Sequence, residues 1–131
     1  MAVFYKKLER GNPLNKTAPK KWYAVLRRAR KVTEKEVAIA LADETTLNRK
    51  EAEMVLAQFQ KILIRHLLEG NSVQLGDWGT FRLTCNSEGF DSKNKVTANG
   101  IKNVKIRFTA GGELRDALKK SEFIDIESMA N

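Results

Sequence analysis

Residues 70–81, Gly-Asn-Ser-Val-Gln-Leu-Gly-Asp-Trp-Gly-Thr-Phe, decide the fold of this 131-residue chain. Val73 and Leu75 alternate with polar residues and predict a short strand, and Gly76-Asp77 predicts a turn. The aromatic-Gly-Thr-aromatic run that follows predicts a second strand. Gly79 stands between two aromatic residues, which indicates a bulge or a close approach of two backbones. A second motif at residues 107–114, Arg-Phe-Thr-Ala-Gly-Gly-Glu-Leu, predicts a strand that ends in a double glycine and leads into a short helix.

Two amphipathic helices are predicted before this hairpin. Thr33-Glu34-Lys35-Glu36 forms a capping box, so the first helix begins there and ends near Glu44. Asn48, with Glu51 three residues later, caps a longer helix that Gly70 ends. The apolar residues of the longer helix recur at the spacing of one buried face: Ala52, Val55, Leu56, Phe59, Ile62, Leu63 and Leu67.

Residues 1–32 form a basic segment with two predicted strands. The segment carries ten basic residues against Glu9 alone, whereas residues 33–131 carry 14 basic and 15 acidic residues. Two apolar runs, at residues 3–8 and 22–26, predict paired strands, and Pro13 lies in the polar loop between them. The charge asymmetry indicates a polyanionic partner.

The two motifs and the helices before them, in this order and spacing, resemble the HU and integration host factor family of bacterial histone-like DNA-bending proteins. The resemblance covers roughly residues 33–120. It implies an α+β fold with a two-helix N-terminal cradle, a three-stranded antiparallel sheet carrying a β-arm at residues 85–103, and a short C-terminal helix. It also implies an intertwined dimer, and the helical stripe favours the same conclusion because it is larger than one small sheet would cover.

The N-terminal extension and residues 96–102, Val-Thr-Ala-Asn-Gly-Ile-Lys, are similar to those of a divergent group of longer HU-related proteins of the Bacteroides type. We therefore divide the chain into a basic N-terminal β extension (1–32), an HU-like DNA-binding domain (33–120) and an acidic C-terminal tail (121–131). The tail contains three acidic residues and no basic residue, and its apolar side chains give it a means of docking back onto the domain.

The resemblance implies that lysine and arginine side chains neutralise DNA phosphates, with steep salt dependence and little sequence preference. Arg82 then occupies a basic position of a saddle under the duplex, and Arg115 and Lys119 occupy basic positions of the final helix. The other candidates implied by the resemblance lie in the arm and on the returning strand: Lys93, Lys95, Lys102, Lys105 and Arg107.

The arm departs from the family pattern. Residues 85–103 contain no arginine and no proline, and their three lysines stand against Glu88 and Asp91. Phe90 or Val96 is left as the apolar residue that would wedge between base steps. We expect a basic run of the N-terminal segment to supply the missing phosphate contacts: Lys20, Lys21, Arg27, Arg28, Arg30 and Lys31. The alternative is that this run is a solvated basic face or contacts an acidic protein.

Composition argues against other classes of function. A single histidine, His66, and a single cysteine, Cys85, leave no catalytic triad, internal disulfide or Cys-His metal site, and no glycine-rich phosphate loop is present. No apolar run reaches the roughly 20 residues that span a bilayer. We therefore expect no enzymatic activity, cofactor, metal, small-molecule substrate or membrane contact, and a cytoplasmic, nucleoid location.

The sequence thus predicts a non-enzymatic, histone-like protein that binds double-stranded DNA as a homodimer, with low sequence specificity and a role in the nucleoid. A heterodimer stays open, since integration host factor relatives pair unlike chains. The alternative hypothesis is an HU-like dimeric structural or protein-interaction module with weak or lost DNA binding. The charge-depleted arm and the net charge of −1 over residues 33–131 favour that alternative.

Overall fold

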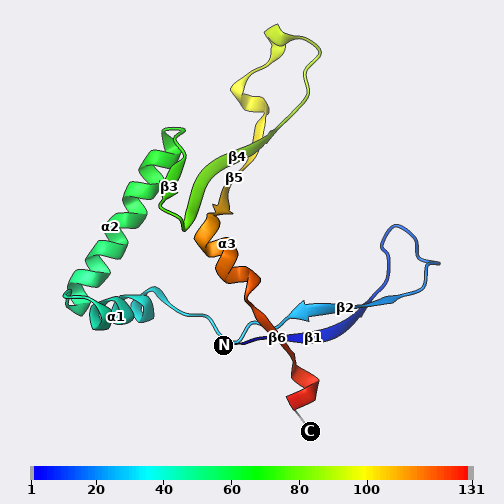
Figure 1. The fold of residues 1–131 in the computed structure, drawn as a ribbon. Helices are drawn as coiled ribbons and strands as arrows, with labels where there is room; N and C mark the ends of the chain where they lie inside the picture. Colours follow the sequence, from blue (N-terminus) through cyan, green and yellow to red (C-terminus); the bar gives the residue numbers. More distant parts are fainter. Residues whose placement is uncertain (1, 130–131) are drawn as a thin grey trace. The chain divides into compact units, whose positions relative to one another are not determined.

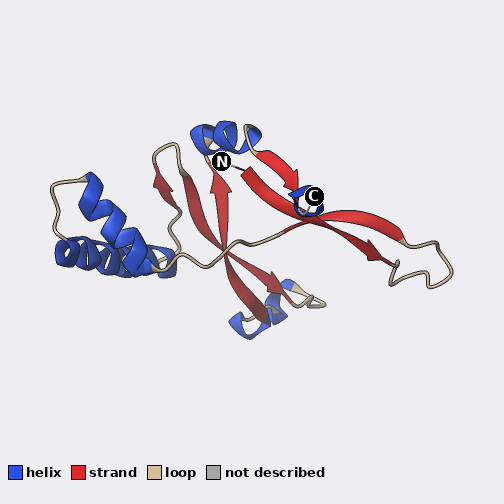
Figure 2. Ribbon diagram, turned by 90° about the horizontal axis from the view of Figure 1, so that it is seen from below, coloured by secondary structure: helices blue, strands red, loops and turns tan. Residues whose placement is uncertain are grey.

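The computed structural model describes residues 2–129, which divide into two compact units. The central unit spans Thr33–Asp116, and the N-terminal unit joins residues 2–32 to residues 117–129. The chain is a mixture of helices and two separate three-stranded sheets, drawn in red in Figure 2. The elements in chain order (Figure 1) are β1 (Ala2–Arg10), β2 (Lys21–Leu26), α1 (Glu34–Glu44), α2 (Arg49–Leu68), β3 (Val73–Leu75), β4 (Gly79–Ser87), η1 (Lys93–Lys95), η2 (Ala98–Gly100), β5 (Ile101–Ala110), α3 (Gly112–Lys119), β6 (Glu122–Asp125) and η3 (Ile126–Met129).

The two helices of the central unit begin where the capping residues predict. The Thr33 hydroxyl accepts a hydrogen bond from the Glu36 amide at 3.3 Å, and the Asn48 side-chain oxygen accepts one from the Glu51 amide at 2.8 Å. Each bond satisfies an amide that has no partner inside the helix. At the other end of α2, Gly70 takes a φ of 87°, a left-handed conformation that suits glycine. Both predicted N-caps are therefore confirmed.

The two sequence motifs meet in the sheet of the central unit. Its strand order is β3-β4-β5, with antiparallel pairing throughout. The Gly111 amide donates to the Trp78 carbonyl at 2.9 Å, and a Cβ on Gly111 would lie 2.1 Å from the Asp77 carbonyl oxygen. A Cβ on Gly79 would lie 2.5 Å from the Phe108 ring, which confirms the predicted close approach. Gly111 thus joins the β3–β4 turn to the start of α3, and Gly79 lies against β5.

The core of the central unit is small. Ala38 of α1 and Ala52 and Leu67 of α2 are buried, and α2 contacts β3 and β4. Three aromatic rings form a cluster beside the sheet, with ring centroids 4.8 to 5.6 Å apart: Trp78, Phe81 and Phe108. Apolar side chains of α2 stay exposed both on the predicted stripe, at Val55 and Ile62, and away from it, at Met54, Ile64 and Leu68.

The sheet of the N-terminal unit has the order β2-β1-β6. β1 and β2 pair antiparallel, which confirms the predicted pair of strands. β6 pairs parallel with β1, with Val3 opposite Phe123, and a 2.9 Å ion pair joins Lys7 to Asp125. Within the predicted acidic tail, residues 121–131, the segment 122–125 forms a strand of the same sheet as β1. No residue of this unit among those described is buried, and aromatic side chains are exposed on it.

Candidate nucleic-acid interface

One face of the central sheet is lined by basic and polar side chains. Side chains of directly opposed residues share a face, and every second residue along a strand returns to that face. Arg82 lies opposite Arg107, and the pairs on either side of it continue the same face toward both ends of the strands: Thr80 with Thr109, and Thr84 with Lys105. The alternate positions, Phe81 with Phe108 and Leu83 with Ile106, form the apolar face. We call the first set the cationic face.

The two arginines of the cationic face have no counter-charge. Arg82 and Arg107 are exposed, and neither makes an ion pair with another residue in the range 2–129. Like charges directly opposite each other in a sheet are destabilising. A bound anion would remove that repulsion, so this pair marks a position suited to a phosphate or a carboxylate.

A hollow of about 520 Å³ lies at the end of the cationic face next to α3. Its polar lining consists of the arginine pair, Thr80, Thr109, Gln74 and the single acidic residue Asp77, together with Gly111 and Gly112. Sequence reasoning named the two arginines and missed the threonines and Gln74. The alternation of polar and apolar residues along β4 and β5 was the signal that would have found them.

The arm continues β4 and β5 beyond a change of register (Figure 1). Thr84 pairs with Lys105, but Asn86 pairs with Lys102, so the single residue Cys85 lies opposite two residues of β5. One of these two, Asn103, has a φ of 54°. Such a bulge bends the strands and increases their twist. The bulge keeps Lys102 on the cationic face, opposite Asn86, but Lys102 is ion-paired with Glu88.

The candidate cations and wedge residues at the tip of the arm differ in how exposed they are. Lys93 and Lys95 are exposed in the short helix η1. The Phe90 ring packs on Gly100, since a Cβ there would lie 2.6 Å from the ring, and Gly100 is buried. Val96 is 57% exposed. Of the two wedge candidates, Val96 is therefore the one whose side chain is not engaged in packing the arm.

The remaining predicted cations lie outside the cationic face. Arg115 and Lys119 are exposed one turn apart on α3, and Lys21 is the first residue of β2. After β2 the chain runs without regular structure into α1, and the Arg27 amide donates to the Phe4 carbonyl at 2.8 Å. The other members of the basic run are exposed in this connection or just before β2: Lys20, Arg28, Arg30 and Lys31.

The described part of the chain holds no group of three or more His, Cys, Asp or Glu side chains placed to bind a metal ion. Across residues 2–129, every helix is too short or too polar to cross a membrane. The arrangement offers cations and hydroxyl groups on a sheet face, which can bind phosphate through charge and hydrogen bonds.

Comparison with known proteins gives a family and two structures. The family model HU-HIG, described as "HU domain fused to wHTH, Ig, or Glycine-rich motif", matches residues 1–125. No curated protein matches the chain. The crystal structure of a proposed bacterial DNA-binding protein from Bacteroides vulgatus is similar with a TM-score of 0.64 and 14% sequence identity; the match covers 94% of this chain and 48% of that one. HU from Anabaena, in a cocrystal structure with DNA, is similar with a TM-score of 0.54 and 22% identity over 68% of this chain and 99% of its own.

Proposed function

This chain belongs to the HU-HIG family of HU domains, and we propose that it is a non-enzymatic protein that binds double-stranded DNA as a homodimer with low sequence specificity. The observation that carries the proposal is the uncompensated arginine pair, Arg82 opposite Arg107, on a face lined with threonines. Basic side chains that contact phosphates release counterions, and this release gives affinity without selecting a sequence. Threonine hydroxyls add hydrogen bonds to phosphate oxygens.

A second copy of the chain would cover apolar surface that the monomer leaves exposed. The described residues have an accessible surface of 11516 Å², whereas two compact bodies of the sizes of the two units would expose roughly 8,300 Å². Part of the excess lies on the stripe of α2, where Val55 and Ile62 are 52% and 37% exposed. An interface of standard size buries about 1,600 Å². The difference between the observed and the expected accessible surface is larger than this, which supports the proposed dimer.

The other predicted cations would extend the phosphate contacts beyond the cationic face. Lys93 and Lys95 lie on the arm, and Arg115 and Lys119 lie on α3. The basic run of residues 20–31 adds further positive charge, most of the net charge of the chain. With such contacts in place of base-specific hydrogen bonds, we propose an architectural role in the nucleoid. Val96 is the residue we assign as a wedge between base steps.

The alternative is an HU-like dimeric structural or protein-interaction module in which DNA binding is weak or lost. Two observations favour it: Glu88 neutralises Lys102 of the arm, and residues 33–131 carry a net charge of −1. Recovery of an acidic protein in a pull-down that resists nuclease treatment would support this alternative. Recovery of DNA alone would count against it.

Fluorescence anisotropy with a duplex of roughly 25 base pairs across a salt series tests the leading proposal. The double variant Arg82→Gln/Arg107→Gln should weaken binding and reduce the slope of log K against log salt by about 0.9 for each phosphate that the variant no longer neutralises. Lys35→Gln/Lys50→Gln is the matched control, because it removes the same charge from exposed helix positions away from the sheet. If the wild-type protein fails to bind the duplex even at low salt, the proposal is wrong.

A further inference from the structure

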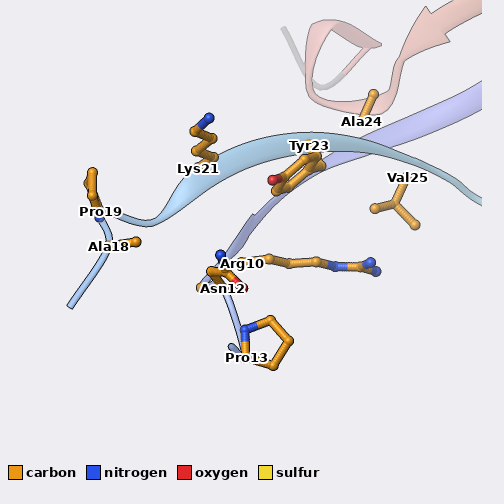
Figure 3. Close-up of a pocket in the computed structure, with 10 residues that line it drawn as sticks. Arg10, Asn12, Pro13, Ala18, Pro19, Lys21, Tyr23, Ala24 and Val25 are labelled. Carbon is orange, nitrogen blue, oxygen red and sulfur yellow. The ribbon is translucent and has the colours of Figure 1, made fainter. Parts of the chain in front are cut away.

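A second concave surface lies in the N-terminal unit, on the hairpin of β1 and β2 and the loop between them. It is an open hollow of about 760 Å³. Figure 3 shows Arg10, Tyr23 and Val25 on the strands beside this hollow, with Pro13 on the loop below them. Lys21 of this lining belongs to the basic run of residues 20–31 that we propose for duplex contacts, and the other lining residues have no role in the proposals above.

The register of the hairpin gathers these side chains on one face. Arg10 lies opposite Lys21, and Tyr23, two residues after Lys21, lies opposite Leu8. Because side chains alternate along a strand, Tyr23 shares a face with the Arg10–Lys21 pair and Trp22 lies on the opposite face. Tyr23 is 48% exposed. Two cationic residues and an accessible aromatic ring therefore line the hollow, and Figure 3 shows the two cationic side chains extending in different directions, Lys21 upward from β2 and Arg10 along the strands.

The loop that closes the hollow is held by its own asparagines. The side-chain oxygen of Asn12 accepts a hydrogen bond from the Leu14 amide at 2.9 Å, and the Asn15 amide donates to the Asn12 carbonyl at 3.2 Å. The Asn15 side chain in turn accepts from the Thr17 amide at 3.1 Å. These bonds set the course of the backbone around Pro13 at the wall of the hollow.

Charge and shape together indicate the ligand. Neither Arg10 nor Lys21 makes an ion pair with another described residue, although they lie directly opposite each other, and this like-charge pair favours an anion. An exposed tyrosine beside cations is the arrangement on which unpaired bases stack while their phosphates contact the charges. A duplex does not offer this combination, because its base faces are covered within the stack.

We propose that this hollow binds single-stranded nucleic acid, with a base stacked on Tyr23 and the neighbouring phosphates held by Arg10 and Lys21. Pro13 and Val25 give the base apolar contact on the remaining sides of the hollow. Single-stranded DNA and RNA offer the same phosphates and base faces, so both are candidate ligands. The site is distinct from the cationic face and lies in a different unit of the chain.

The test uses the full chain and three labelled probes: oligo-dT and oligo-U of about 12 nucleotides, and the duplex used for the cationic face. Tyr23→Ala should weaken binding to the single-stranded probes by about tenfold, as expected for loss of one base stack, and leave the duplex affinity unchanged. Trp22→Ala is the matched control, since it removes the neighbouring exposed aromatic from the opposite face. Tyr23→Phe should retain binding, and Arg10→Gln should weaken it.

The outcomes separate this site from the cationic face. Arg82→Gln/Arg107→Gln should lose duplex affinity and keep single-strand affinity, so failure of one proposal leaves the other measurable. Wild-type protein that binds neither single-stranded probe would overturn the inference, as would equal losses for Tyr23→Ala and Trp22→Ala. Self-association that depends on Tyr23, without single-strand binding, would also overturn it and assign the hollow to a second copy. Stronger binding to oligo-dT or to oligo-U identifies the natural ligand as DNA or RNA.

A photochemical experiment gives a direct second measurement. An oligonucleotide that contains 5-bromouracil should cross-link to a peptide that includes Tyr23 when the wild-type protein is irradiated. Far-UV circular dichroism of each variant checks that the fold is intact, which we expect because the substituted side chains are exposed or partly exposed. A cross-link confined to residues of β4 and β5 would overturn the assignment to the hairpin.

Discussion

Arg82 of β4 lies directly opposite Arg107 of β5, and neither has a carboxylate partner among the residues described. The arrangement repeats in the other unit, where Arg10 of β1 lies opposite Lys21 of β2. In a sheet selected for stability alone, opposite charges would be placed at such positions. Both pairs are therefore positions at which a bound anion would relieve repulsion, as we propose for each of the two sites.

Removing one member of the arginine pair should stabilise the free protein while it weakens DNA binding. Arg82→Gln relieves a like-charge contact worth about 0.2–1 kcal/mol, so the melting temperature should rise slightly at low salt. Lys102→Gln is the control, because it removes a cation that is already paired with Glu88 and should not stabilise. Thermal melts paired with duplex anisotropy measure both effects. A fall in melting temperature for Arg82→Gln would show that the pair is not repulsive.

Two neighbouring glycines should respond differently to the same substitution. Gly111→Ala places a Cβ 2.1 Å from the Asp77 carbonyl oxygen, a backbone atom that cannot move aside, and should lower the free energy of unfolding by about 1–3 kcal/mol. Gly112→Ala meets nothing within 4 Å and should be neutral or stabilising by up to about 1 kcal/mol, because alanine favours the helix that begins there. Urea unfolding of the two variants is the measurement. Equal effects would contradict the packing seen at Gly111.

The ion pair between β1 and the C-terminal strand should make the N-terminal sheet sensitive to pH at both extremes. The hydrogen bond from Lys7 lowers the pKa of Asp125 below its ordinary value, and Asp125 raises the pKa of Lys7. The Asp125 contribution is present above the ordinary pKa of aspartate and is lost as the pH falls through its lowered pKa. The Lys7 contribution is present below the ordinary pKa of lysine and is lost as the pH rises through its raised pKa.

Lys7→Met tests this dependence. The difference in melting temperature between wild type and variant should be small, since the pair is at the surface, and should be largest near neutral pH. It should fall toward zero at the lowest pH of the series, as the carboxylate becomes protonated. A difference that persists at that pH would assign the effect of the substitution to packing instead of charge.

The apolar stripe of α2 should control the oligomeric state. Ile62→Glu places a charge on the exposed apolar surface that we assign to the dimer interface, so sedimentation velocity should shift toward the monomer. Glu53→Gln, at an exposed polar position of the same helix, is the control and should leave the dimer intact. A wild-type protein that sediments as a monomer at every concentration would contradict the proposed homodimer.

Local signals predicted most of the elements. The N-caps at Thr33 and Asn48 depend on residues three positions apart, and Gly79 is recognisable from its aromatic neighbours, so each is visible in a short window of sequence. The pairing of β6 with β1 was not visible in this way, because parallel pairing between distant segments leaves no local pattern. The sequence also predicted one set of cations without separating those that share a face, because that separation depends on the register of β4 against β5.

The candidate site was predicted in part. Arg82 and Arg107 were named individually, but their direct opposition depends on the register of β4 against β5. Lys102 was named as a contact, whereas its charge is paired with Glu88 across the arm. Phe90 was one of two wedge candidates, and its packing on Gly100 follows from the fold of the arm tip, which no spacing rule describes.

The parallel pairing of β6 with β1 sets an order of events during synthesis. Ala2 pairs with Glu122, so the partner of the first strand leaves the ribosome 120 residues later. Contacts at such long sequence separation form slowly, because the loop between them must be closed first. The elements of the central unit are neighbours in sequence, so this unit can fold before β6 has been synthesised and paired with β1. Until then β1 has a free edge, and in a crowded cell that edge is open to the β6 strand of another nascent chain.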